Sequence, residues 1–154
     1  MIKNAVVSDA SIIQSLVNTY AKNGEMLSLS LNEVYERLYE FVLWIEDGKA
    51  IGVCALHPTW ADIAEIRSLA VMPEFSRKKI GTKLVNFMLD RAKEMGFKKV
   101  FALTYREDFF KTIGFQVTNI ENLPKKIWTD CLKCVKYPDC DETAVIINLF
   151  EGSN

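Results

Sequence analysis

The sequence predicts an α/β fold of the α+β type, in which helices flank one central mixed sheet. Segments with apolar residues at every second position alternate along the chain with segments whose apolar residues recur every three or four positions. The chain has 154 residues, of which 49% are apolar and 25% charged, and this composition is ordinary for a globular protein with a sizeable core. No repeat, low-complexity tract or interdomain linker is evident, so we expect a single domain over residues 1–154.

Capping and turn residues set the bounds of the predicted elements. Ser8 or Asp9 is expected to cap the first helix, and Ser30 with Glu33 three residues later predicts a capping box for the second. Asp47-Gly48 favours a tight hairpin turn. In order we expect a strand at 2–7, a helix ended by Asn23-Gly24, a helix from Ser30, strands at 41–46, 50–56 and 63–71, a helix at 80–95 ended by Gly96, a strand at 98–105, a helix at 107–113, a strand at 115–120, an irregular stretch at 121–141 and a strand at 143–149.

The most informative segment is the junction between the strand at 63–71 and the helix that follows it. The turn from Ser76 to Thr82 is basic, and the helix opens at about Ile80. First-turn N–H groups of a helix lack intrahelical partners and lie at the positive end of its dipole, so the junction suits an anion such as a phosphate-bearing ligand. A solvated basic turn before an ordinary amphipathic helix is the alternative. Neither G-x-x-x-x-G-K-[ST] nor G-x-G-x-x-G occurs in the sequence.

The run L-A-V-M-P-E-F, followed by the basic loop and I-G-T-K-L-V, resembles the acyl-CoA site of the GNAT superfamily of N-acetyltransferases. Downstream, V-F-A-L-T-Y-R-E-D-F-F-K-T-I-G-F is similar to the next strand and helix of that fold, and ends in the family's x-G-F at Gly114 and Phe115. The resemblance covers nearly the whole chain. It implies a single-domain, mostly antiparallel sheet with a V-shaped splay between the strands at 63–71 and 98–105, and acetyl-CoA as co-substrate.

By this resemblance the strand at 63–71 offers main-chain groups to the pantetheine arm, and the basic loop holds the pyrophosphate. The family's loop usually has Gln or Arg, two residues, Gly, one residue, then Gly or Ala, where this chain has Ser76, Lys79 and Gly81. A lysine at the glycine position must either accept the glycine backbone geometry or shift the loop. The implied cofactor-binding residues are Leu69, Ala70, Val71, Ser76, Arg77, Lys78, Lys79, Ile80, Gly81, Thr82, Phe109 and Phe110.

Acetyl transfer to an amine needs a base for the ammonium group, and the departing thiolate must gain a proton. Glu65 is the predicted base, because partial burial in a cleft would raise its pKa; a salt bridge to Arg67 is an equally weighted alternative. Arg67 is also the candidate to bind the carboxylate of an amino-acid acceptor. Many GNAT enzymes carry a tyrosine acid where this chain has Phe109 and Phe110, so Tyr105 is the candidate acid, with an ordinary strand-end tyrosine as its alternative.

The tail from Leu123 to Glu142, with E-x-R-S-L-A-V and L-T-Y-x-x-x-F-F, resembles small stand-alone GNAT proteins related to the acetyltransferase domain of N-acetylglutamate synthase. This implies an amino acid such as glutamate as the acceptor and a place in arginine biosynthesis. Two acceptor carboxylates would need two cations, and the second candidate beside Arg67 is Lys125 or Lys126. The resemblance also implies that Met26 and Leu27 line the acceptor cleft, although they could simply pack a connecting loop.

Composition and cysteine spacing indicate which metals and partners to expect. Cys131, Cys134 and Cys140 could supply three zinc-binding thiolates, but no fourth ligand is evident, and reduced cysteines packing the tail are the favoured interpretation. We therefore expect no metal. A net charge of −1 and the lack of a ~20-residue apolar run predict a cytoplasmic protein without nucleic-acid or membrane partners. A homodimer is compatible with the family.

Three functions from different classes follow from the sequence. The first is an acetyl-CoA-dependent amino-acid N-acetyltransferase with Glu65 as base. The second is an acyl-CoA-binding module without turnover, suggested by the missing tyrosine and by Lys79 in the loop. The third is a metal-stabilised interaction domain, and a GNAT enzyme acting on another amine or on a protein N-terminus is a further alternative.

Overall fold

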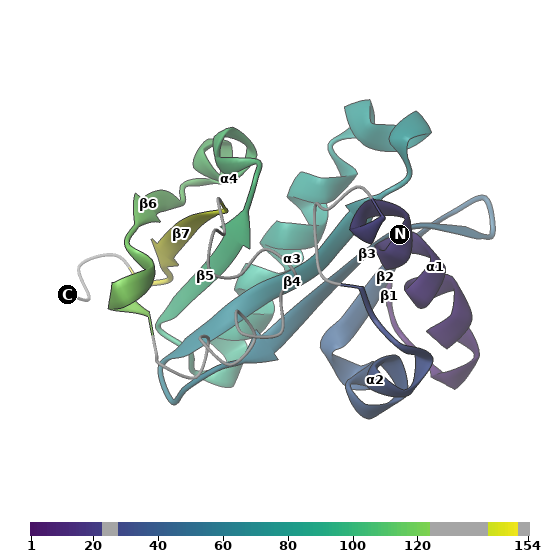
Figure 1. Ribbon diagram of the computed structural model, residues 1–154, viewed down its shortest axis with the longest axis horizontal. Helices are drawn as coiled ribbons and strands as arrows, with labels where there is room; N and C mark the ends of the chain where they lie inside the picture. The colour runs from purple at the N-terminus through teal and green to yellow at the C-terminus, as the bar shows by residue number, and fades with distance from the viewer. Residues whose placement is uncertain (23–27, 124–141, 151–154) are drawn as a thin grey trace. The chain divides into compact units, whose positions relative to one another are not determined.

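The computed structural model describes residues 1–22, 28–123 and 142–150, with only the backbone of residues 76 and 77. Figure 1 shows the arrangement of the strands and α-helices. In chain order they are β1 (Ile2–Asn4), α1 (Ala10–Ala21), α2 (Leu31–Glu36), β2 (Phe41–Glu46), β3 (Lys49–Pro58), β4 (Ile63–Val71), α3 (Ile80–Met95), β5 (Lys99–Thr104), α4 (Glu107–Ile113), β6 (Gln116–Thr118) and β7 (Thr143–Asn148). Short 3-10 helices occur at Val7–Asp9, Leu38–Glu40, Pro73–Lys78 and Ile120–Asn122.

The strands of the described residues form a seven-stranded sheet in the order β1-β2-β3-β4-β5-β7-β6. The pairs β1–β2, β2–β3, β5–β7 and β6–β7 are antiparallel, whereas β4 and β5 are parallel. The register of β4 with β5 pairs Ile63–Glu65 with Lys99–Phe101, which is the first third of β4. The predicted mixed, mostly antiparallel sheet flanked by helices is therefore confirmed.

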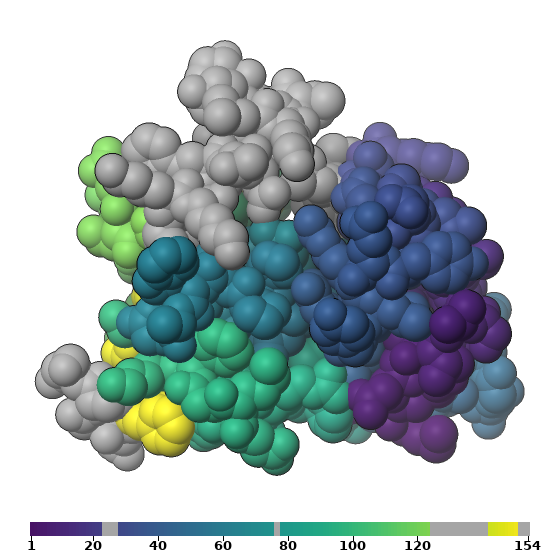
Figure 2. All heavy atoms as spheres, turned by 90° about the horizontal axis from the view of Figure 1, so that it is seen from below, coloured from purple at the N-terminus to yellow at the C-terminus, as the bar shows by residue number. Residues whose placement is uncertain are grey.

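The chain forms two compact units, of which the first comprises Met1–Leu56 and Ile66–Met88. In this unit α1 and α2 pack against one face of the strands, and Figure 2 shows their side chains lying against one another, α1 in purple and the segment around α2 in dark blue. The alternation of side chains along β2 and β3 sends every second residue into this core. Its buried members are Ala10, Ile13, Leu16, Val17, Val34, Phe41, Leu43, Val53, Ala55 and Ala70.

Helix α3 packs against the opposite face of the same strands, where Gly52 allows a close approach. A Cβ at Gly52 would lie 3.2 Å from Leu84 Cδ1 and 3.4 Å from Ile80 Cγ2, both in the first turns of α3. The Trp44 Cβ of the neighbouring strand would be 3.5 Å away. The missing side chain therefore sets how closely the start of α3 approaches β3.

Gly52→Val should destabilise the protein, because its methyl groups would enter space already filled by Leu84 and Ile80. Overpacking of this kind typically costs about 1–3 kcal/mol. Urea unfolding followed by circular dichroism measures the effect. Gly48→Ala is not a suitable control, because Gly48 has a positive φ of 76° and any side chain there would be strained. Ala50→Val on the same strand is the matched control. An equal stability of Gly52→Val and the parent protein would contradict the close packing.

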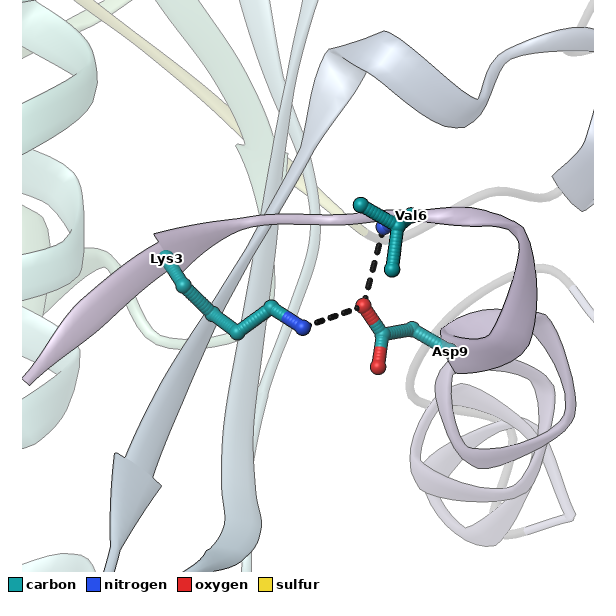
Figure 3. Close-up of polar contacts among 3 residues, drawn as sticks. All are labelled: Lys3, Val6 and Asp9. Carbon is teal, nitrogen blue, oxygen red and sulfur yellow. Dashed lines mark hydrogen bonds and ion pairs between the residues drawn. The ribbon is translucent and has the colours of Figure 1, made fainter.

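The start of α1 differs from the predicted cap. Asp9 precedes α1, but its carboxylate accepts a hydrogen bond from the Val6 N–H at 2.9 Å, across the 3-10 turn Val7–Asp9. Lys3 Nζ lies 2.8 Å from the same oxygen, as Figure 3 shows. Partial burial alone would raise the pKa of Asp9, but the bonds from Lys3 and Val6 outweigh it and hold the pKa below its usual value.

Asp9→Asn should therefore lower stability near neutral pH by about 0.5–1 kcal/mol, the range for a partly exposed ion pair. A carboxylate whose pKa is lower in the folded than in the unfolded state stabilises the protein above the unfolded value, ~3.9, and this contribution is lost as the pH falls through the folded value. The difference from the parent protein should therefore shrink toward pH 3. Thermal unfolding at pH 7, 5 and 3 tests this, with the exposed Asp90→Asn as control. A pH-independent difference would be inconsistent with the ion pair.

The second unit comprises His57–Glu65 and Leu89–Asn154. Its buried cluster joins β4, β5 and β7 through Ile63, Phe101 and Ala144, together with Leu123. At the end of α4, Gly114 has a φ of 118° and the Phe115 N–H donates to the Phe110 carbonyl, which closes the helix with a left-handed cap. This cap lies at the x-G-F signature.

Other predicted features fall into two groups. The capping box at Ser30 and Glu33 is confirmed, and both Asp47 and Gly48 have the positive φ values of a tight hairpin turn. The strands expected at 2–7 and 115–120 are shorter, Ile2–Asn4 and Gln116–Thr118, because the 3-10 helices Val7–Asp9 and Ile120–Asn122 begin at their ends. None of the helices in the described part of the chain is long and apolar enough to cross a membrane.

Candidate active site

The end of β4 is irregular at the point where the resemblance places the pantetheine arm. Ser68 has a φ of 55°, a left-handed conformation that costs a non-glycine residue on the order of 1–2 kcal/mol and interrupts the regular strand. Beyond it, Ala70 is buried in the core of the first unit, while Leu69 and Val71 are half-buried. The Met72 N–H then donates to the Ile51 carbonyl at 2.8 Å, which ties the strand end to β3.

The basic loop is a 3-10 helix at Pro73–Lys78, followed by a single left-handed residue and then by α3. Lys79 has φ 58° and ψ 26°, so the lysine accepts the backbone geometry that glycine usually supplies, which answers the question raised by the sequence. The Lys83 N–H donates to the Lys79 carbonyl at 3.1 Å and closes the first turn of α3. The N–H groups of Ile80, Gly81 and Thr82 precede the first intrahelical donor, the Lys83 N–H, so they have no intrahelical acceptor and form the positive end of the α3 dipole.

The lysines of this loop contact aromatic and acidic side chains of the same unit. Lys78 Nζ lies 3.6 Å from Glu46 Oε2 on β2 and 5.4 Å from the ring centroid of Phe75. Lys83 Nζ lies 5.4 Å from the centroid of Trp44. Glu46 Oε2 accepts no hydrogen bond from the described residues, so its main favourable interaction there is the ion pair with Lys78. The loop is thus cationic, with one lysine partly neutralised.

In the second unit, Glu65 is buried at 7% exposure, which is unusual for a carboxylate. The register places it opposite Phe101 of β5, on the face that carries Ile63 and Phe101. Tyr105 follows the last residue of β5 and is 36% exposed. Glu65 is paired with Phe101, and Tyr105 comes four residues after Phe101, so the two positions are about 13 Å apart along the strand direction.

A model of the Acetyltransferase (GNAT) family matches residues 11–115, more than two thirds of the chain. The match includes β4, the basic loop, α3, β5 and α4. The chain belongs to the GNAT family. An uncharacterized N-acetyltransferase of Chlorobaculum tepidum is 39% identical over 148 residues, 96% of each chain. An amino-acid acetyltransferase of Mycobacterium tuberculosis is 36% identical over 129 residues, 80% of this chain and 71% of the relative.

Solved structures of GNAT proteins superpose closely. N-acetylglutamate synthase of Neisseria gonorrhoeae, complexed with coenzyme A and N-acetyl-glutamate, gives a TM-score of 0.89 at 26% identity over 97% of this chain and 35% of that one. Rv2747 of M. tuberculosis, in complex with CoA, gives 0.84 at 27% identity over 97% and 99%. The predicted GNAT-like fold is therefore confirmed, and this GNAT chain is an N-acetyltransferase.

The predicted site residues of this GNAT chain are distributed over both units. The first unit brings the loop residues together with Leu69, Ala70 and Val71, and it also holds the half-buried Arg67. Glu65, Tyr105, Phe109 and Phe110 belong to the second unit. Outside the described residues lie Met26, Leu27, Lys125, Lys126, Cys131, Cys134 and Cys140, and of Ser76 and Arg77 only the backbone is described.

Phe109 and Phe110 differ from each other in environment. Phe110 is 4% exposed, and its ring packs edge-on against Phe109 and Phe115 with centroid distances of 5.1 Å. This burial favours a packing role for Phe110. Phe109 is only half-buried and is the better candidate of the two for contact with a ligand.

Cys54 on β3 is a fully buried cysteine. Burial raises the pKa of the Cys54 thiol to about 12, so this thiol stays protonated at physiological pH and is a poor acetyl acceptor. Within residues 1–22, 28–123 and 142–150 no group of three His, Cys, Asp or Glu side chains could hold a metal ion. The three tail cysteines lie outside those ranges.

Two residues near the loop were not singled out from the sequence. Tyr20 lies in the last turn of α1, and its hydroxyl donates to the Val71 carbonyl. Glu46 was expected only as the end of a strand, and it pairs with Lys78. No sequence signal identifies either contact, because each joins residues far apart in the chain.

Proposed function

We propose that this protein transfers the acetyl group of acetyl-CoA to the amino group of an amino acid, with glutamate as the first candidate. Acetyl-CoA is the co-substrate; the solved GNAT relatives that superpose on this chain were crystallised with coenzyme A. The observation that carries the proposal is the loop geometry: left-handed Lys79 leads into the positive end of α3 beside Lys78 and Lys83. Such an arrangement favours the pyrophosphate of CoA, and the implied contacts are Leu69 to Val71 with the pantetheine arm.

In the proposed mechanism the acceptor amine attacks the thioester directly. The Glu65 carboxylate accepts a proton from the acceptor ammonium, and the free amine then forms a bond to the thioester carbonyl carbon. Collapse of the tetrahedral intermediate breaks the C–S bond and releases the CoA thiolate, while the nitrogen loses its second proton to water and becomes the neutral amide. Tyr105 donates a proton to that thiolate, or water does so, since a CoA thiol is a fair leaving group. The burial of Glu65 supports its role, because a desolvated carboxylate accepts a proton more readily.

The acceptor is proposed from charge and from the relatives. Arg67 on β4 is half-buried and would bind one acceptor carboxylate through its planar guanidinium group, with Lys125 or Lys126 binding the second. A relative of 36% identity is named an amino-acid acetyltransferase, and the gonococcal structure carries N-acetyl-glutamate. Acetylation of glutamate would place the reaction at the entry to arginine biosynthesis.

The test is thiol release from acetyl-CoA across free amino acids, with glutamate, aspartate, lysine and a short peptide in the panel. Acetylated product is confirmed by mass spectrometry. Acetylation of glutamate with kcat/KM at least tenfold above that of aspartate supports the full proposal. Turnover restricted to another amine would retain the reaction and reject the acceptor. Binding of CoA without any turnover would instead favour the non-catalytic acyl-CoA-binding module.

A further inference from the structure

The end of β4 is held by a side chain from a distant helix. The Tyr20 hydroxyl, in the last turn of α1, donates a hydrogen bond to the carbonyl oxygen of Val71, the last residue of β4. Fifty-one residues separate the two in sequence. The aromatic ring of Tyr20 packs against the core formed by α1, α2 and the strands, so the ring is placed by packing and the hydroxyl by the hydrogen bond.

The Val71–Met72 peptide is therefore fixed from both sides. Its carbonyl accepts from Tyr20, and its N–H, that of Met72, donates to the Ile51 carbonyl at 2.8 Å. The Met72 carbonyl in turn accepts from the Phe75 N–H at 2.9 Å, inside the 3-10 helix. The Val71–Met72 peptide thus links α1 to β3, and the next carbonyl along the chain, that of Met72, joins it to the first turn of the basic loop.

This anchorage lies between two strained residues. Ser68 upstream and Lys79 downstream both have left-handed backbone conformations, with φ values of 55° and 58°. Such conformations persist only when surrounding contacts hold the chain in place. The Tyr20 bond is a contact from a side chain to the backbone between them, whereas the Ile51 bond joins two backbone groups and would form with any side chain at either position.

We propose that Tyr20 is a positioning residue for CoA: its hydroxyl orients the Val71–Met72 peptide and so sets the path of the chain from the pantetheine-pairing strand into the pyrophosphate loop. The inference rests on the proposed function of that loop. It also assigns the Val71 carbonyl to Tyr20, so that of Val71 only the N–H is proposed to pair with pantetheine, beside the main-chain groups of Leu69 and Ala70. Tyr20 itself makes no chemical step.

The test is Tyr20→Phe, which removes the hydroxyl and keeps the ring in the core. Isothermal titration with CoA should show a Kd raised about five- to tenfold, the loss expected for one hydrogen bond that positions a site. The KM for acetyl-CoA should rise similarly, while kcat at saturating acetyl-CoA stays within about twofold. Tyr35→Phe, on the exposed face of α2, is the matched control and should leave both constants unchanged.

Amide hydrogen exchange provides a second measurement that does not depend on turnover. In Tyr20→Phe the amides from Met72 to Lys83 should exchange faster, while those of β1 and α2 keep the parent rates. A CoA Kd within twofold of the parent value, or a loss of kcat with Kd unchanged, would overturn the positioning role. If the parent protein itself binds no CoA, the proposed function fails first, and the exchange result alone then shows whether Tyr20 orders the loop.

Discussion

Replacing Glu65 with glutamine is expected to lower kcat by about 10²- to 10³-fold while leaving the affinity for CoA within twofold. The substitution keeps the size and hydrogen-bonding shape of the side chain but removes its ability to accept a proton, and general bases typically contribute 10²–10⁴ in rate. Steady-state kinetics with saturating acetyl-CoA measures the first effect, and calorimetric titration with CoA measures the second. A loss of kcat without a loss of CoA affinity would assign Glu65 to the chemical step and not to cofactor binding.

The pH dependence of the glutamine variant makes the test sharper. Without a base, turnover should depend on acceptor molecules that are already deprotonated, so the residual kcat should rise about tenfold per pH unit below the pKa of the acceptor amine. Asp62→Asn is the matched control, because Asp62 is an exposed acid three residues before Glu65 in the same unit. Unchanged turnover in Glu65→Gln would remove Glu65 from its proposed role.

The double charge reversal Lys78→Glu/Lys79→Glu should weaken CoA binding by about 10- to 100-fold at 20 mM salt. Both lysines belong to the loop that leads into α3, and each reversal replaces an attraction for phosphate with a repulsion. Because the charges are exposed, the difference should shrink to about threefold at 0.5 M salt, where the Debye length is only a few ångströms. Titration with CoA at both salt concentrations measures it.

The control for this pair carries the same change in net charge at a different place. Lys93→Glu/Lys98→Glu alters two exposed lysines near the C-terminal end of α3 and should leave CoA binding within twofold. Since Lys78 pairs with Glu46, reversal also brings two carboxylates together, and Lys78→Gln/Lys79→Gln provides a neutral version with the same direction of effect. Equal CoA affinity of the reversed and parent proteins at low salt would place the phosphates elsewhere.

Local signals in the sequence were sufficient for the elements that surround the site. The strand Ile63–Val71 and the helices Ile80–Met95 and Glu107–Ile113 have the predicted bounds, because each has a clear periodicity and ends at a proline, a glycine or a cap. The capping box at Ser30 was predictable for the same reason. Interactions within three or four residues are encoded locally, and the chain follows them here.

Features that depend on tertiary contacts were not predictable. Periodicity says nothing of the left-handed Ser68 within an otherwise regular strand, nor of the 3-10 helix that the basic turn forms at Pro73–Lys78. The contacts of Tyr20 with Val71 and of Glu46 with Lys78 join segments that only the fold brings together. The sequence indicated which residues could serve the reaction, whereas the fold determines which neighbours orient them.

At Lys79, folding stability and the proposed attraction for the cofactor favour different residues. A glycine at position 79 would adopt the left-handed conformation without the roughly 1 kcal/mol that a side chain costs there. It would therefore favour the folded junction between β4 and α3. Lysine places a positive charge directly before the N-terminus of α3, which is the end of the helix that attracts anions. Under the proposed function, lysine at this position favours binding of the cofactor, whereas glycine would favour folding. A thermostabilised version of the enzyme that carried glycine here would gain a small amount of folding free energy and lose part of its attraction for the cofactor.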